Sequence, residues 1–209
     1  MGKRPVITFL GPSGIGKTTL AKWVSDEFRI PFVSGSYSDL VPSTRNLHHS
    51  KMIDLPAEEI LKSDIQLLRL RNESYRLHRN QGMVSDRSPL DILAYSFIKL
   101  SQRVPTCDLD KLWELVLSNL YLVDIIIYMP FPINSLSEWD FEPNGKRITN
   151  KYFQWMVSIL MNAVLTKVDR KLEFIKPETF LTLPTTSLEE RKLMISHFLS
   201  PILEKWKEE

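Results

Sequence analysis

Eight residues near the amino terminus restrict the fold of this chain more than any other feature. The segment Gly11–Thr18 reads Gly-Pro-Ser-Gly-Ile-Gly-Lys-Thr and fits the pattern G-x-x-x-x-G-K-S/T. It follows an apolar, β-branched run, Val6–Leu10, and precedes the segment Lys17–Phe28, whose apolar residues recur with helical spacing. A strand, a glycine-rich turn and a helix in this order predict a phosphate-binding loop, or P-loop.

Each part of this loop has a role in binding phosphate. Glycines let the backbone turn its N–H groups inward, and the positive end of the following helix attracts the anion. We predict that Lys17 reaches the β- and γ-phosphates of ATP as a catalytic residue, and that the Thr18 hydroxyl binds Mg²⁺. The alternative is a structural glycine turn with a solvated lysine. The residues predicted to bind the nucleotide are Gly11, Pro12, Ser13, Gly14, Ile15, Gly16, Lys17, Thr18 and Thr19.

Strand-like and helix-like segments alternate along the rest of the chain, which is typical of a layered α/β domain. Right-handed crossovers between them would give a mostly parallel sheet covered on both faces. We therefore predict one domain, residues 1–209, with a three-layer P-loop NTPase fold and about five strands. The predicted strands are 6–10, one beginning at 31–33, 83–85, 123–129 and 179–183; the predicted helices are 17–28, 57–80, 89–100, 108–120, 150–171 and a last one from 187, which Pro201 kinks or interrupts.

A second candidate site follows the predicted strand at residues 83–85. Asp86 and Arg87 come directly after this strand and before a helix opened by Pro89. Because ligands bind at the carboxyl ends of parallel strands, both side chains are expected near the phosphates held by Lys17. Asp86 is a candidate base for an attacking hydroxyl or a ligand of Mg²⁺, and Arg87 is a candidate clamp for an anionic acceptor. The alternative for Asp86 is helix capping.

These motifs resemble those of a known group of enzymes. The P-loop, the Asp-Arg-Ser triplet and the run Ser88–Tyr95 are similar to those of P-loop kinases of the thymidylate kinase and deoxynucleoside kinase type. They resemble most the compact branch that includes ribosylnicotinamide kinases, and also phage kinases that phosphorylate 5-hydroxymethyluracil within DNA. The resemblance implies that Asp86 lies beside the acceptor hydroxyl and that Arg87 contacts acceptor or phosphate.

The resemblance also implies a lid with basic residues. We assign it to residues 132–149, where Gly145 permits movement and Lys146 and Arg147 would close over the transferred group. An ordinary exposed turn is the alternative. Asp39 and Arg45, in the polar loop after the second predicted strand, are candidate contacts to the acceptor.

Other polar residues carry less specific signals. The basic cluster on the helix at 57–80 is predicted to be a solvated face, or else a guide for a polynucleotide; it comprises Arg69, Arg71, Arg76, His78 and Arg79. Trp139 would stack on a base or simply pack. Asp124 begins its strand, at the end away from the crevice, and is not assigned to the metal.

Composition restricts the partners. With 27 basic and 25 acidic residues the net charge is +2, which argues against tight, non-specific binding to nucleic acid. The single cysteine, Cys107, excludes an intramolecular disulfide, and no apolar run is long enough to span a membrane. We expect a cytoplasmic protein, in the host cytoplasm if it is viral, and leave its oligomeric state open.

The function that combines these signals is phosphoryl transfer. Mg·ATP in the P-loop would donate its γ-phosphate to a hydroxyl of a nucleoside, a nucleoside monophosphate, or a 5-hydroxymethyluracil base in phage DNA. The alternative is a P-loop switch or assembly ATPase that hydrolyses its nucleotide. The guanine-reading pattern N-K-x-D is missing, because Asn150-Lys151 continues into Tyr-Phe, which weakens the GTPase version.

Overall fold

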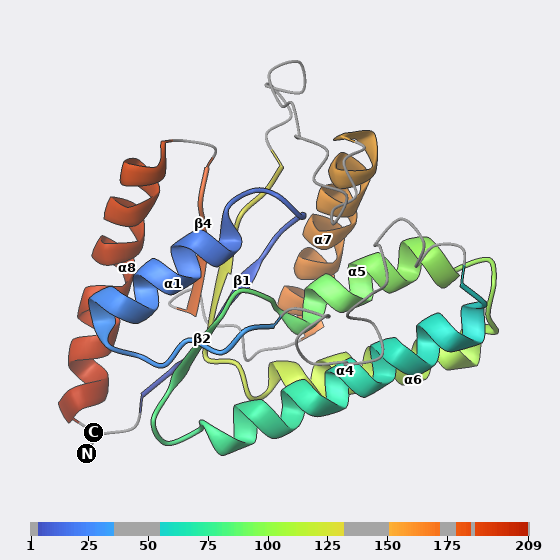
Figure 1. Ribbon diagram of the computed structural model, residues 1–209, viewed down its shortest axis with the longest axis horizontal. Coiled ribbons are helices and arrows are strands. Elements are labelled where there is room, and N and C mark those ends of the chain that lie inside the picture. Colours follow the sequence, from blue (N-terminus) through green and yellow to red (C-terminus); the bar gives the residue numbers. More distant parts are fainter. Residues whose placement is uncertain (1–3, 36–54, 132–150, 172–178, 185–186, 209) are drawn as a thin grey trace.

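The fold is built on a four-stranded parallel sheet, seen in the centre of Figure 1. The computed structural model describes residues 4–35, 55–131, 151–171, 179–184 and 187–208. The spatial order of the strands is β2-β1-β3-β4, and each of the three neighbouring pairs is parallel. The strands are β1 (Val6–Leu10), β2 (Met83–Ser85), β3 (Ile125–Tyr128) and β4 (Phe180–Thr182).

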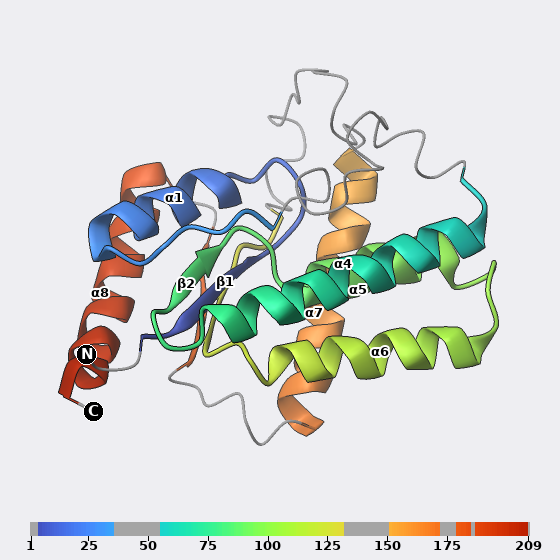
Figure 2. The same cartoon turned by 60° about the horizontal axis from the view of Figure 1, so that its bottom comes forward.

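Helices cover both faces of this sheet, and the views agree on their arrangement (Figures 1 and 2). On one side lie α1 (Lys17–Phe28) and α8 (Leu188–Glu208), and the remaining helices lie on the other side. This matches the predicted three-layer P-loop NTPase class. The other helices are α4 (Ala57–Leu77), α5 (Pro89–Leu100), α6 (Thr106–Leu120) and α7 (Lys151–Lys171).

The two cores follow from the alternation of side chains along the strands. In β3, Ile125 and Ile127 pack with α1 and α8, whereas Ile126 and Tyr128 pack with α4, α5, α6 and α7. All four side chains are buried, which explains why the strand is apolar without alternation in the sequence.

Two predicted elements differ from the structure. The expected strand at 31–33 is reduced to one parallel bridge, Phe32 to Val84, with Val33 N–H donating to the Val84 carbonyl (2.9 Å). Pro31 has no N–H group to donate to β2, so the backbone hydrogen bonds cannot extend into a longer strand. The last helix, α8, continues through Pro201, so the proline does not interrupt it; the residues that α8 buries before the proline include Ile195 and Leu199.

No helix within the described ranges is long and apolar enough to cross a membrane.

Candidate phosphate-binding site

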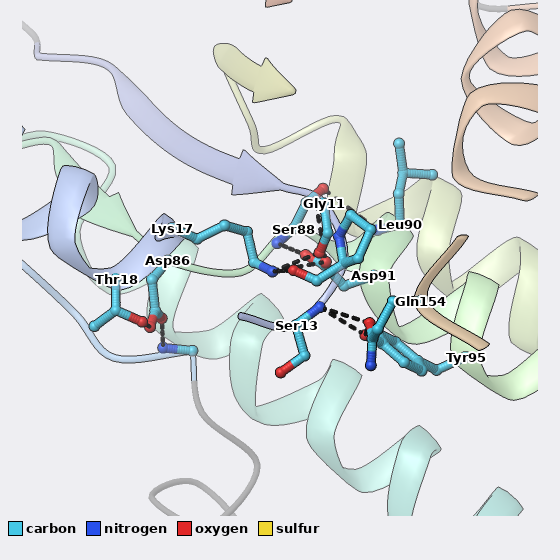
Figure 3. A network of polar contacts seen from close by, with 12 residues as sticks. Gly11, Ser13, Lys17, Thr18, Asp86, Ser88, Leu90, Asp91, Tyr95 and Gln154 are labelled. Atoms are coloured by element: carbon cyan, nitrogen blue, oxygen red, sulfur yellow. Dashed lines mark hydrogen bonds and ion pairs between the residues drawn. The ribbon is translucent and has the colours of Figure 1, made fainter. Parts of the chain in front are cut away.

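The register of the sheet brings the two sequence motifs together. Thr8 of β1 pairs with Ser85 of β2, so both strands end at the same edge of the sheet. The glycine-rich loop leaves β1 at this edge, and Asp86 leaves β2 there. Residues about 70 positions apart in the sequence therefore surround one site, which Figure 3 shows from close by.

The loop is curled as a phosphate cradle requires. Gly14 and Gly16 adopt positive φ angles of 90° and 91°, which a side chain would strain. Gly16 is the N-cap of α1 and makes no side-chain cap, so the positive end of this helix faces the loop. Ile15 is buried, its carbonyl accepts from Arg191 Nη1 (3.1 Å), and Thr18 and Thr19 are exposed.

Lys17 is turned into the loop. Its side chain is 5% exposed, and its ammonium donates to the carbonyls of Gly11 (2.5 Å) and Pro12 (2.6 Å). The same nitrogen lies 4.0 Å from the Asp91 carboxylate. A buried ammonium needs such partners, because burial without them is very unfavourable. Lys17 is thus held on the inner side of the loop, where its charge would meet a bound anion.

Asp86 faces the loop as the sequence reasoning expected. One carboxylate oxygen accepts from the Thr18 hydroxyl (2.6 Å), and the other accepts from the Gly35 amide (2.9 Å). The side chain is buried at 4% exposure. A hydroxyl and a carboxylate in contact form a pair of hard oxygen ligands beside the phosphate cradle.

This pair fits the chemistry of Mg²⁺. Magnesium is usually bound by one or two carboxylates together with substrate phosphates and water, not by a cage of protein ligands. Within the described part of the chain, no group of three or more His, Cys, Asp or Glu residues is placed to hold a metal. The donor set of Thr18 and Asp86 is therefore of the type that suits a nucleotide-bound Mg²⁺.

Arg71 corrects the expectation of a solvated basic face on α4. Its guanidinium is 3% exposed and donates to the carbonyls of Ser88 (2.8 Å) and Gly35 (2.5 Å). Ser88 lies two positions after Asp86, and the Gly35 amide donates to the Asp86 carboxylate, so Arg71 holds both segments that meet at this carboxylate. Leu67 and Leu68, four and three positions earlier, are also buried, and this helical spacing is the signal that could have revealed Arg71.

Replacing Arg71 by methionine should lower the free energy of unfolding by about 2–4 kcal/mol, because two buried carbonyls lose their donor. Urea denaturation measures this loss. The matched control is Arg69→Met, since Arg69 lies on the same helix but is exposed. If both substitutions lowered the free energy of unfolding by the same small amount, Arg71 would not hold the segments around Asp86.

Gly35 approaches Arg87 too closely for any side chain. A Cβ atom built on Gly35 would lie 2.6 Å from Arg87 Cβ and 2.8 Å from Ser85 Oγ. Arg87 Cβ is fixed to the backbone, so the clash cannot be relieved by turning a flexible end. Glycine at this position therefore allows the contact between the Gly35 amide and Asp86.

We expect Gly35→Ala to destabilise the protein by about 1–3 kcal/mol, the range for overpacking of a buried site. Thermal unfolding measures the change. A variant with the wild-type melting temperature would show that the backbone around Gly35 can shift to relieve the clash without loss of stability.

Arg87 lies close to Asp91 and Tyr95 of α5. Burial lowers the pKa of its guanidinium, but Asp91, Tyr95 and Asp86 outweigh burial, so this pKa lies above its usual value. Burial raises the pKa of Tyr95 to about 12, so its hydroxyl stays protonated at neutral pH.

The Ser13 amide of the P-loop donates to Tyr95 Oη (3.0 Å) and to Gln154 Oε1 (2.9 Å). The sequence did not identify Gln154, because no pattern around this residue indicates that α7 contacts the P-loop.

Several predicted residues lie outside the described parts of the chain. The acceptor candidates Asp39 and Arg45, the lid at 132–149 with Lys146 and Arg147, and Trp139 all belong to this group. Asp124 lies at the amino-terminal edge of the sheet, as expected, where it accepts from the Val6 amide (2.9 Å) and pairs with Arg79 (3.6 Å).

Comparison with known proteins identifies the family of this chain. A family model described as an AAA domain matches residues 6–147, which is more than half of the chain. The match includes both the glycine-rich loop and the Asp-Arg-Ser segment. No curated protein matches the chain.

Solved structures with a similar fold include two kinds of nucleotide-binding protein. Deoxyadenosine kinase from M. mycoides, solved with dCMP and dCDP, superposes with a TM-score of 0.67 at 15% identity, over 94% of this chain and 98% of that one. The NadR protein in complex with NAD and AMP-PNP gives a TM-score of 0.62 at 13% identity, over 93% of this chain and 49% of that one. This chain thus spans about half the length of NadR. At these identities the similarity establishes the fold alone, which this chain shares with both proteins.

Proposed function

We propose that this chain, which belongs to the AAA domain family, is a P-loop kinase that transfers the γ-phosphoryl group of ATP to a hydroxyl of a nucleotide-type acceptor. The acceptor is a nucleoside, a nucleoside monophosphate or a hydroxymethyl base in DNA. The observation that carries the proposal is the 2.6 Å contact between Asp86 and Thr18, which places a carboxylate against the P-loop. A similar fold in deoxyadenosine kinase supports the same class of reaction.

The geometry suggests a role for each residue in the transfer. Loop amides and Lys17 would bind the β- and γ-phosphates and neutralise the charge that develops during transfer. Thr18 and Asp86 would hold Mg²⁺, which supplies further charge neutralisation when bound. Arg87 would orient the anionic groups of acceptor or donor. In the described parts of the chain, these residues converge on one edge of the sheet.

The chemical step is an in-line displacement. The acceptor oxygen forms a bond to the γ-phosphorus while the bond from this phosphorus to the β,γ-bridging oxygen breaks, and ADP leaves. The acceptor hydroxyl proton passes to Asp86. Each carboxylate oxygen of Asp86 accepts one hydrogen bond in the structure and keeps a second lone pair for this proton.

Several further assignments belong to the proposal. One domain would span residues 1–209, with a lid at 132–149 whose Lys146 and Arg147 close over the phosphates. Asp39 and Arg45 would contact the acceptor. The single cysteine and the balanced charge support a cytoplasmic location and a small-molecule acceptor over duplex DNA.

A transfer assay with γ-labelled ATP tests the function. The acceptor panel holds deoxynucleosides, ribosylnicotinamide, nucleoside monophosphates and DNA containing 5-hydroxymethyluracil. We expect label to appear in one of these acceptor classes. Release of ADP at a rate that no acceptor changes would overturn the kinase assignment and favour a nucleotide-hydrolysing ATPase.

A further inference from the structure

Asp91 is a buried carboxylate at the centre of the site that the proposed mechanism does not yet use. It occupies the third position of α5 and is 2% exposed. Oδ2 accepts from the Ser88 amide (2.6 Å), and Oδ1 accepts from the Gly11 amide (3.3 Å). Figure 3 shows the carboxylate between the loop and the start of α5. One side chain thus joins the first residue of the P-loop to the segment that carries Asp86.

The charge of Asp91 has buried cations as neighbours. The Lys17 ammonium lies 4.0 Å from Oδ1, and both of these side chains are almost fully buried. Burial lowers the pKa of the Arg71 and Arg87 guanidinium groups, and Asp91 opposes this effect; the pKa of Arg71 stays below its usual value, whereas that of Arg87 lies above it. Because buried cations need a compensating anion, loss of this carboxylate would affect the site beyond the cap of one helix.

Another capping box in the same chain shows what capping alone requires. At the start of α8, a single oxygen of Glu190 accepts from both the amide and the hydroxyl of Ser187 (2.9 Å each). That glutamate is exposed. Asp91 makes the same type of contact to Ser88 with one oxygen only, and its second oxygen is directed at Gly11 and Lys17. The second set of contacts has no part in capping.

We propose that Asp91 is a positioning residue that acts through Lys17. It holds the ammonium on the inner side of the P-loop, in the position where the ammonium would meet the β-phosphate. This inference rests on the proposed function, because it assumes that Lys17 binds the β-phosphate of a nucleotide. Asp91 itself does not touch the reacting groups.

A double-mutant cycle between Asp91→Asn and Lys17→Met tests this role. Titration calorimetry measures the Kd of ADP and AMP for the wild type, both single variants and the double variant. Thermal unfolding is recorded for the same four proteins. Glu190→Gln serves as the matched capping control, and Asp91→Glu restores the charge at the same helix position.

Asp91→Asn is expected to raise the Kd of ADP by about tenfold, because the Lys17 ammonium is no longer held in the position where it meets the β-phosphate. The Kd of AMP, which has no β-phosphate, should stay within about twofold of wild type. In the Lys17→Met background the same substitution should leave the Kd of ADP unchanged within about twofold. Asp91→Glu should recover part of the affinity, and Glu190→Gln should bind ADP as the wild type does.

Unfolding gives a readout that does not depend on the function. Each single variant should lower the melting temperature by about 5 °C or more, and the double variant by clearly less than the sum. Equal loss of ADP affinity in both backgrounds, or additive shifts in melting temperature, would overturn the role of Asp91. If the wild type binds no nucleotide, the proposed function fails, and the unfolding cycle still decides whether Asp91 and Lys17 act as a pair.

Discussion

Replacement of Lys17 by methionine should reduce phosphoryl transfer by roughly 10³-fold, the largest effect expected of any single substitution in this chain. The ammonium is held against the Gly11 and Pro12 carbonyls inside the loop, where little water screens its charge. Methionine is unbranched and of similar size, and it removes both the charge and the N–H donors that bond these two carbonyls. Steady-state transfer from labelled ATP at saturating acceptor measures the loss.

The matched control for this substitution is Lys22→Met. Lys22 lies on the same helix, α1, but is exposed and makes a cation–π contact with Phe32 at 5.8 Å. Its replacement should leave the transfer rate within about twofold of wild type, because an exposed charge is screened by solvent. A Lys17 variant that stays folded and retains full transfer would contradict the assignment of this loop as the phosphate site.

The second large effect is expected for Asp86→Asn. Turnover should fall by roughly 10²–10³-fold, while the Kd of ADP without metal changes little, because the amide keeps the shape of the side chain and loses its charge. The single oxygen of the asparagine amide can still accept from the Gly35 amide, and its NH2 group can donate to the Thr18 hydroxyl oxygen. Comparison of the maximal turnover with the Kd separates chemistry from binding.

Asp124→Asn is the control for Asp86. Asp124 is also hydrogen-bonded to a backbone amide and paired with an arginine, but it lies at the opposite edge of the sheet. We expect this variant to lose some stability and to keep its turnover. If Asp86→Asn turned over as fast as Asp124→Asn, Asp86 would be neither the base nor a ligand of the metal.

The elements whose signals lie close together in the sequence were predicted well. The bounds of β1, β2, α1 and α5 agree with the structure, because a short apolar run, a glycine turn and a Ser-Pro start each act through local backbone preferences. The parallel sheet with helices on both faces also followed from the alternation of elements. The weakest prediction was the strand at 31–33, where pairing with Val84 extends over one bridge only.

The polar interior of the site was harder to predict. Arg71 belongs to a basic cluster that looks solvated in sequence, yet it is buried and bonded to Gly35 and Ser88. Its helical spacing with Leu67 and Leu68 indicates the burial, but its bonding partners depend on the packing of α4 against α5. The same holds for Gln154, which reaches the Ser13 amide from α7, 141 positions away in the sequence.

The amino-acid sequence alone therefore determined the glycine-rich loop, the helix behind it and the carboxylate at Asp86, because these depend on backbone conformation and on neighbouring residues. Only the tertiary structure decided which buried groups surround them: Asp91 against Lys17, Arg71 against Gly35, and Tyr95 and Gln154 against Ser13. The physical reason is that a buried charge or amide needs a hydrogen-bond or ionic partner, and the packing of the elements determines which residue is close enough to be that partner. That partner is set by the contact of whole helices and strands, not by distance along the chain.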